Sequence, residues 1–173
     1  LARVTEALEG GARVVQYRDK TSTPAARLGI ALALAALCRA HTVPLIINDD
    51  VQLALDSGAA GVHLGRGDSD VRAARQQLGD AALIGVSCYN EWQRAQGAQT
   101  QGADYIAFGS FFPSRTKPKA VPAHIDLLHQ ARAELHLPIV AIGGITPENG
   151  AALITAGAHA LAVIEGLWGQ PDV

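Results

Sequence analysis

Two aspartates follow neighbouring apolar runs of this chain, and their carboxylates are of the type that holds a divalent cation. The run 45–47 leads into Asn48 and Asp49, and the run 61–64 is followed by Asp68. Mg²⁺ in proteins prefers one or two carboxylates together with phosphate oxygens and water. If the two runs are adjacent parallel strands, Asp49 and Asp68 can share one Mg²⁺ ion at the strand ends.

Helix capping is the alternative role for the acids of this region. Asp50 and Asp68 each precede a stretch with a helical pattern. A carboxylate at such a position can accept a hydrogen bond from the first turn of the helix. Both roles stay open for Asp68 by itself, whereas the pair of Asp49 and Asp68 favours the metal.

Positive side chains alternate after the short apolar run that begins at Val14. Arg18 and Lys20 flank Asp19, and on an extended backbone they face the same side as Gln16. The fork of an arginine and the point charge of a lysine together suit a diphosphate group. A solvated turn is the alternative.

The segment 111–117 has the composition of a loop that folds over a phosphorylated ligand. It holds two hydroxyl groups, on Ser114 and Thr116, and two cations, Arg115 and Lys117. An ordinary exposed loop would have a similar composition. This segment therefore indicates phosphate binding only in combination with the other clusters.

A glycine pair precedes a helix start and marks a second place for phosphate. Gly143-Gly144 stands just before Thr146-Pro147, which is typical of a helix N-terminus. Glycine lets the backbone approach a ligand closely, and free N–H groups at a helix start attract anions. In barrel enzymes such a phosphate site often follows the last strands.

Other reactive residue types do not form a recognisable site. His63 lies within an apolar run, and we expect it in the core or behind the metal ligands. The two cysteines, Cys38 and Cys88, cannot make a disulfide framework, so a reducing, cytoplasmic setting is expected. No spacing suggests a nucleophilic triad or a histidine-based metal site.

Apolar runs and helical patterns alternate along the whole chain. We predict strands at 14–19, 45–49, 61–65, 83–88, 105–109, 138–143 and 160–165. We predict helices at 1–9, 23–40, 50–57, 68–78, 91–101, 123–134 and 147–156. Such alternation is typical of α/β proteins with a parallel sheet.

A doubly wound sheet and a (β/α)8 TIM barrel both fit this alternation. Reactive clusters at nearly every strand end favour the barrel, because its strand ends meet at one mouth. The chain opens on a helical pattern, has a short tail after Trp168 and has no methionine among its 173 residues. We therefore expect a single barrel domain over 1–173, a fragment lacking its first strand and last helix.

Composition excludes several classes of partner. A net charge of −2 argues against general binding of nucleic acid, and 49% apolar residues allow a large core. No apolar run approaches the roughly 20 residues that cross a bilayer. We expect small-molecule substrates, no nucleic acid and no membrane, and the sequence leaves the oligomeric state open.

Taken in order, the polar clusters resemble the thiamine-phosphate synthase (thiamine-phosphate pyrophosphorylase) family over nearly the whole chain. The resemblance implies a (β/α)8 barrel and a transferase of thiamine biosynthesis. Such an enzyme joins hydroxymethylpyrimidine diphosphate to thiazole phosphate, requires Mg²⁺ and releases diphosphate. The segments that carry the resemblance are 16–20, 48–50, 61–65 with Asp68, 85–88, 108–117 and 141–145.

The resemblance also implies a role for each matching residue. Asp49 and Asp68 would hold Mg²⁺. The pyrimidine diphosphate would be bound by Gln16, Arg18, Lys20, Asn48, Ser87 and Lys117. The thiazole phosphate would be bound by Ser114, Thr116, Gly144 and the backbone at Ile164 and Glu165. Substrate contacts are also expected for Tyr17, Asp19 and Arg115, and catalytic roles for Arg18, Lys20, Ser87 and Lys117.

One departure from the family pattern concerns the thiazole-phosphate site. The family usually has serine where Glu165 stands, and a carboxylate beside a phosphate is unfavourable unless its side chain turns away. Two alternatives therefore stay beside the synthase. One is the related thiazole tautomerase, which needs neither the paired acids nor the diphosphate cations. The other is a phosphate-ligand binding module without turnover.

Overall fold

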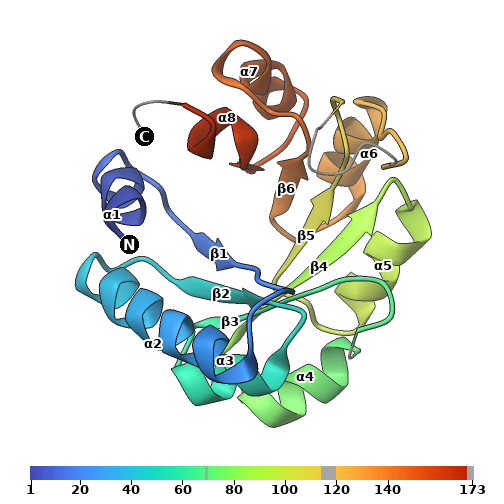
Figure 1. Cartoon of the computed structure of the whole chain (residues 1–173). Helices are drawn as coiled ribbons and strands as arrows, with labels where there is room; N and C mark the ends of the chain where they lie inside the picture. The colour runs from blue at the N-terminus through green and yellow to red at the C-terminus, as the bar shows by residue number, and fades with distance from the viewer. Residues whose placement is uncertain (69, 114–119, 171–173) are drawn as a thin grey trace. The chain divides into compact units, whose positions relative to one another are not determined.

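The computed structural model describes residues 1–68, 70–113 and 120–170, in which helices and strands alternate (Figure 1). Four residues with expected substrate contacts lie outside the described residues: Ser114, Arg115, Thr116 and Lys117. The chain divides into two compact units, formed mainly by Leu1–Ile84 and Gly85–Asp172.

The first unit contains three short parallel strands, each followed by a helix. Strand β1 pairs with β2, and β2 pairs with β3. The elements are α1 (Ala2–Glu9), β1 (Val15–Tyr17), α2 (Pro24–Ala40), β2 (Leu45–Asn48), α3 (Val51–Ser57), β3 (Gly61–Leu64) and α4 (Val71–Leu78).

The second unit repeats the same alternation, and its strands also pair in parallel in chain order. Strand β4 begins in the last residues of the first unit and continues into the second. The elements are β4 (Leu83–Tyr89), α5 (Trp92–Thr100), β5 (Tyr105–Phe108), α6 (Asp126–Glu134), β6 (Ile139–Ile142), α7 (Pro147–Thr155), β7 (Ala160–Ala162) and α8 (Glu165–Trp168).

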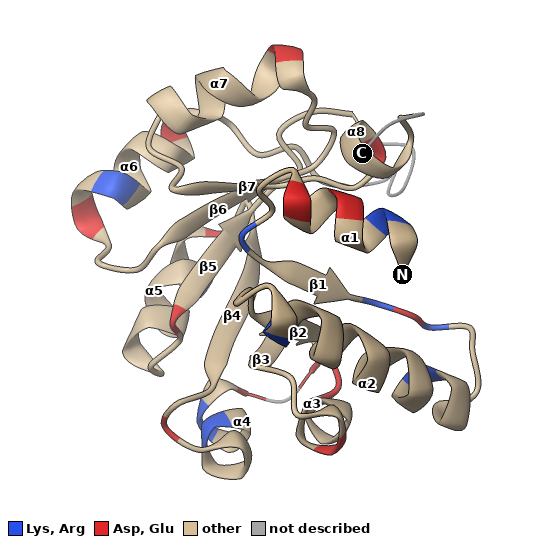
Figure 2. Cartoon of the chain, turned by 90° about the vertical axis from the view of Figure 1, so that its left-hand side faces the viewer, with Lys and Arg blue, Asp and Glu red and all other residues tan. Residues whose placement is uncertain are grey.

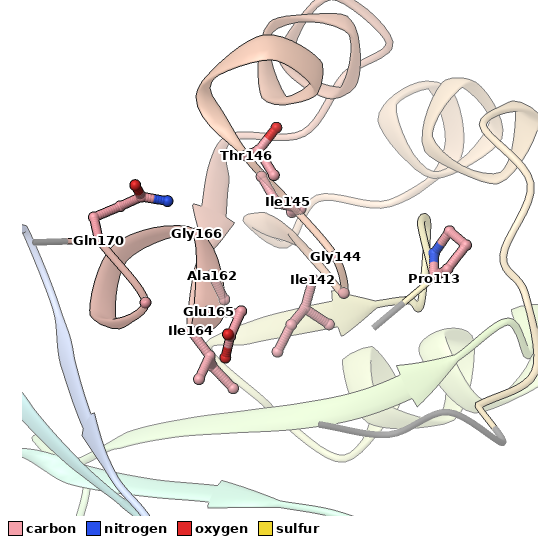
Figure 3. A pocket seen from close by; sticks show the side chains of 12 residues that line it. Pro113, Ile142, Gly144, Ile145, Thr146, Ala162, Ile164, Glu165, Gly166 and Gln170 are labelled. Atoms are coloured by element: carbon pink, nitrogen blue, oxygen red, sulfur yellow. The ribbon is translucent and has the colours of Figure 1, made fainter. Parts of the chain in front are cut away.

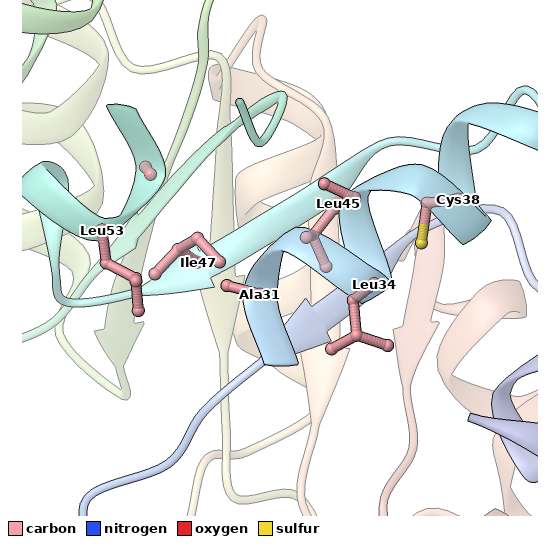
Figure 4. Packing of buried hydrophobic residues seen from close by; sticks show 8 residues of the cluster. Ala31, Leu34, Cys38, Leu45, Ile47 and Leu53 are labelled. Carbon is pink, nitrogen blue, oxygen red and sulfur yellow. The ribbon is translucent and has the colours of Figure 1, made fainter. Parts of the chain in front are cut away.

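The core of the first unit forms where α2 packs on β2 and α3 (Figure 4). One face of α2 is buried because small and apolar residues recur on it at helical spacing. Each leucine or isoleucine buried here stabilises the fold by roughly 1.5–3 kcal/mol. The labelled members of the cluster are Ala31, Leu34 and Cys38 on α2, Leu45 and Ile47 on β2, and Leu53 on α3.

Aspartate side chains cap the starts of α3 and α4. Asp50 Oδ1 accepts a hydrogen bond of 2.9 Å from the Leu53 N–H at the start of α3. Asp70 Oδ1 accepts one of 2.7 Å from the Ala73 N–H at the start of α4. The capping alternative is therefore correct for Asp50. Helix α4 begins after Asp70, later than predicted, so Asp68 does not cap it.

The prediction for the last strand was too long. Strand β7 ends at Ala162, and Glu165 is the first residue of the short helix α8. The apolar residues after Ala162 resemble a strand in sequence, but they lead into a turn that packs closely. A Cβ atom at Gly166 would lie 2.3 Å from the carbonyl oxygen of Ile145. Only glycine therefore fits at this position of α8.

Among the described residues, none of the helices combines the length and apolarity needed to cross a bilayer. Cys38 and Cys88 are both free and buried.

Candidate active site

The two predicted metal ligands and one predicted cation meet in a pocket of the first unit. Lys20 Nζ lies 2.8 Å from Asp49 Oδ2. Asp68 Oδ2 accepts a hydrogen bond of 2.6 Å from the Gly65 N–H, which directs this side chain back toward the end of β3. Together with Arg18 and Asn48, these three side chains line an open pocket of about 640 Å³.

Asp49 has a left-handed backbone directly after β2, with φ of +67°. Aspartate tolerates this region better than most residues, although it remains unusual outside glycine. The Asp49 N–H donates to the His63 carbonyl oxygen at 2.8 Å, and the Asp50 N–H donates to the Asn48 carbonyl oxygen at 2.9 Å. The chain therefore turns sharply at Asp49 and presents its carboxylate at the strand end.

The electrostatics of Asp49 and Asp68 indicate two interacting carboxyl groups. Burial alone would raise the pKa of Asp49, but hydrogen bonds from Lys20 and Asp68 and the charges of Lys20 and Arg18 outweigh it and lower the pKa. Burial raises the pKa of Asp68, and the hydrogen bond with Asp49 and its negative charge raise it further. Repulsion between carboxylates of this kind is relieved by a cation.

The segment after β1 alternates in exposure as it alternates in charge. Gln16, Arg18 and Lys20 are exposed, whereas Tyr17 and Asp19 are half-buried. Figure 2 shows the resulting blue, red and blue segment beyond the end of β1. Tyr17 packs against the core of the first unit, which fixes the alternation and leaves Gln16, Arg18 and Lys20 exposed, with Lys20 paired to Asp49.

Asp19 organises the loop after β1. Its Oδ1 atom accepts hydrogen bonds from the N–H and hydroxyl of Thr21, at 2.9 and 3.0 Å, and from the Ser22 N–H at 3.0 Å. Tyr17 OH donates to its Oδ2 at 3.4 Å. Hydrogen bonds from Ser22 and Thr21 hold the pKa of Asp19 well below its usual value. Its charge is thus used to fix the loop that follows Lys20.

This pocket is not lined by four other predicted residues: Gln16, Tyr17, His63 and Ser87. His63 is buried on β3 with 6% of its surface exposed, as expected for a core residue. Ser87 is half-buried on β4 in the second unit, and its carbonyl oxygen accepts a hydrogen bond of 2.6 Å from Arg94 Nε. The expected contact of Ser87 with the pyrimidine diphosphate stays a prediction.

A second pocket lies within the second unit (Figure 3). Its volume is about 370 Å³, and it is bordered by the turn before α7 and by the start of α8. Gly144, Ile164 and Glu165, three predicted phosphate contacts, all line it together with Thr146. The structure thus brings these predicted residues to one place.

Glycine is required at position 144 by geometry. Its φ is +61°, and a Cβ atom there would lie 2.3 Å from the carbonyl oxygen of Pro113. The Phe112 N–H donates to the Gly143 carbonyl oxygen at 3.1 Å, which holds the two backbone segments together. The glycine pair therefore lets the chain before residue 114 run directly against this pocket.

Asn149 fixes the turn between the glycine pair and α7, a role that the sequence analysis missed. Its Oδ1 accepts a hydrogen bond of 2.9 Å from the Thr146 N–H, and its Nδ2 donates to the Gly144 carbonyl oxygen at 3.0 Å. A polar residue three positions after Thr146 was the available signal, because asparagine there can close a capping box.

Glu165 supplies the only charged side chain among the described residues lining the second pocket. It is exposed, and its Oε1 lies 3.1 Å from the place where a Cβ atom of Gly169 would be. The carboxylate therefore runs along α8 toward Gly169. It still borders the pocket, so it would repel a phosphate there.

Comparison with known proteins identifies the family of this chain. A family model described as thiamine monophosphate synthase matches residues 1–167. The chain belongs to the thiamine-phosphate synthase family. It is 56% identical to thiamine-phosphate synthase of Thiobacillus denitrificans over 173 residues, covering 100% of this chain and 82% of the relative. It is 53% identical to that of Nitrosococcus oceani over 170 residues, covering 98% of this chain and 78% of the relative.

A solved structure shows the same fold. Thiamine phosphate pyrophosphorylase from Pyrococcus furiosus superposes with a TM-score of 0.91 at 33% identity, over 99% of this chain and 82% of that one. The chain is thus a thiamine-phosphate synthase, a transferase of thiamine biosynthesis. The predicted TIM-barrel-type α/β fold is confirmed, with seven parallel strands in the described part of the chain.

Proposed function

We propose that this synthase joins hydroxymethylpyrimidine diphosphate to thiazole phosphate in an Mg²⁺-dependent reaction that releases diphosphate. The grouping of Lys20, Asp49 and Asp68 in one pocket carries the proposal. This pocket combines carboxylates for a cation with positive side chains for a diphosphate. The second pocket, around Gly144, would take the phosphate of the thiazole substrate.

Asp49 and Asp68 fit a magnesium ion by their chemistry. Among the described residues, no group of three or more histidine, cysteine or acidic side chains is placed to hold a metal. Two carboxylates with phosphate oxygens and water match what Mg²⁺ accepts, whereas they would be a poor site for a structural zinc. When bound, Mg²⁺ supplies positive charge that stabilises the departing diphosphate.

Arg18 and Lys20 would bind the diphosphate and stabilise the negative charge that it gains on leaving. The carbon–oxygen bond of the pyrimidine substrate breaks with its electron pair passing to diphosphate, and the thiazole nitrogen supplies the pair for the new carbon–nitrogen bond. Gln16, Tyr17, Asp19, Asn48, Ser87 and Lys117 would position the pyrimidine substrate. This chemistry needs no protein nucleophile, and the binding residues act by placing the substrates and stabilising charge.

The thiazole phosphate would be held mainly by backbone groups at Gly144, Ile164 and Glu165, with Ser114, Arg115 and Thr116 as further contacts. The support is the shared lining of the second pocket by the first three residues. Backbone N–H groups bind phosphate without a cationic side chain. The Glu165 carboxylate would weaken this binding without preventing it.

The requirement for two substrates separates this proposal from its alternatives. Diphosphate release should need both phosphorylated precursors and Mg²⁺ together. A tautomerase would convert the thiazole phosphate alone, and a binding module would release nothing. Absence of diphosphate release with both precursors and Mg²⁺ present would contradict the proposal. A cytoplasmic location remains part of it, because the free thiols of Cys38 and Cys88 suit a reducing compartment.

A further inference from the structure

An ion pair that includes neither proposed metal ligand borders the proposed metal and diphosphate pocket. It joins the Arg27 Nη2 atom on α2 to the Asp50 Oδ2 atom at the start of α3. Both residues line the same pocket as Asp49. They are separated by 23 positions in the sequence, so folding brings them together.

Asp50 is held from three sides. Its Oδ1 accepts from the Leu53 N–H at 2.9 Å, its Oδ2 accepts from Arg27, and its own N–H donates to the Asn48 carbonyl oxygen at 2.9 Å. Both carboxylate oxygens are therefore in use. Asp50 is therefore fixed at the start of α3, directly beside Asp49.

Asp49 depends on such fixed neighbours. A non-glycine residue in the left-handed region costs roughly 1–2 kcal/mol and persists only where the surrounding structure holds it. On its N-terminal side Asp49 is held by the hydrogen bond of its own N–H to the His63 carbonyl oxygen, at 2.8 Å. On its C-terminal side the anchor is Asp50, and Arg27 holds Asp50.

The burial of Arg27 suits an anchor. Its side chain is 25% exposed, and its Nε atom is buried without a hydrogen-bond partner among the described residues. Because the pair is only partly exposed, the attraction of the guanidinium for Asp50 is screened less than that of a fully exposed pair. Arg27 also cancels the charge of Asp50 and leaves Asp49 and Asp68 as the acids that meet a cation.

We propose that the Arg27–Asp50 ion pair is a positioning device that holds the turn of Asp49 ready to bind Mg²⁺ with diphosphate. This inference rests on the proposed function of the pocket. It assigns Arg27 and Asp50 to substrate binding indirectly, through the direction of the Asp49 carboxylate, and neither residue touches the reacting atoms.

Three variants of the full chain test the pair by isothermal titration with inorganic diphosphate in the presence and absence of Mg²⁺. Asp50→Asn keeps an oxygen that caps α3 and removes the charge that pairs with Arg27. Arg27→Ala removes the other partner, and Arg27→Lys restores a charge without the fork. Arg39→Ala, an exposed arginine at the end of the same helix, is the matched control.

We expect Asp50→Asn and Arg27→Ala each to weaken Mg²⁺-dependent diphosphate binding about tenfold or more, as supporting residues of metal ligands do. Arg27→Lys should recover part of the loss, and the double variant should lose no more than either single one. In turnover, the half-saturating Mg²⁺ concentration should rise while the rate at saturating Mg²⁺ is largely restored. A purely structural pair would lower thermal stability without this shift.

Two results are decisive. If wild-type protein binds diphosphate with Mg²⁺ and Asp50→Asn binds it equally well, the positioning role is wrong while the proposed function stands. If wild-type protein does not bind diphosphate with Mg²⁺ at all, the proposed function fails and this inference falls with it.

Discussion

Lys20 Nζ lies 2.8 Å from Asp49 Oδ2 and joins the loop after β1 to the turn after β2. The lysine side chain is 58% exposed, and such surface pairs add only about 0–1 kcal/mol to stability. Stability therefore does not account for a lysine at this place. Its position beside a carboxylate in a pocket fits a cation that meets diphosphate.

Replacing Lys20 should separate function from stability. Lys20→Ala should reduce the rate of thiamine phosphate synthesis roughly 100-fold, because the positive charge of Lys20 no longer stabilises the departing diphosphate. The free energy of unfolding of this variant should change by less than about 1 kcal/mol. Arg13→Ala, an exposed cation before β1, is the control and should keep full activity. Unchanged kinetics for Lys20→Ala would remove this lysine from the mechanism.

Asp49→Asn tests the metal role with little effect on the backbone. Asparagine tolerates the left-handed conformation as aspartate does, so the turn at φ of +67° should survive. Loss of the charge should cut activity about 100-fold or more and raise the Mg²⁺ requirement. Asp56→Asn on α3, whose carboxylate accepts a hydrogen bond of 2.7 Å from Gln52, should behave as wild type. Full activity of Asp49→Asn at low Mg²⁺ would contradict the assignment.

Glu165→Ser should improve binding of the thiazole phosphate. The substitution removes the negative charge that borders the second pocket and adds a hydroxyl group. Roughly 1 kcal/mol of repulsion corresponds to a fall in the KM for thiazole phosphate of about fivefold. Glu134→Ser, at the end of α6, serves as the control for a lost surface charge. A higher KM for Glu165→Ser would show that this carboxylate assists the site.

Gly144→Ala and Gly29→Ala should have opposite effects on stability. A Cβ atom at Gly144 would lie 2.3 Å from the Pro113 carbonyl oxygen, whereas one at Gly29 meets nothing within 4 Å. We expect Gly144→Ala to destabilise the protein by roughly 2–4 kcal/mol through strain and overlap. Gly29→Ala lies inside α2 and should stabilise it by about 0.5–1 kcal/mol. Chemical denaturation of both variants measures the difference, and equal stabilities would contradict the described turn.

The two cysteines should be unreactive in the folded protein. Burial raises the pKa of Cys38, and burial raises the pKa of Cys88 to about 12. A raised thiol pKa leaves little thiolate at pH 8, and the thiolate is the reactive form. A chromogenic disulfide reagent should therefore label neither thiol at pH 8 until guanidinium unfolds the chain. Rapid labelling of the native protein would be inconsistent with this burial.

The order of helices and strands could be predicted from local patterns, and so could the main clusters. Asp49, Asp68 and Lys20 were recognisable because each follows an apolar run, and parallel strands end at one edge. The start of α4 could not be located so well, since Asp68 and Asp70 are equally good capping residues in sequence. The structure shows Asp70 as the cap and leaves Asp68 for the pocket.

Contacts between residues that are distant in the sequence could not be predicted from local patterns. Arg27 looks like an ordinary polar position on an apolar helix, and nothing local connects it with Asp50, 23 residues away. The end of β7 was missed as well, because Val163 and Ile164 continue the apolar pattern in sequence although the strand ends at Ala162. Local patterns report periodicity, whereas these features depend on which segments meet after folding.

The most direct test of the account is synthesis of thiamine phosphate by the purified chain from the two phosphorylated precursors, followed by the fluorescence of the oxidised product. We predict product formation that requires Mg²⁺, stops on addition of a chelator and is lost in Asp49→Asn. Product formed at the same rate without any divalent cation, or by Asp49→Asn as by wild type, would contradict the central role given to Asp49 and Asp68.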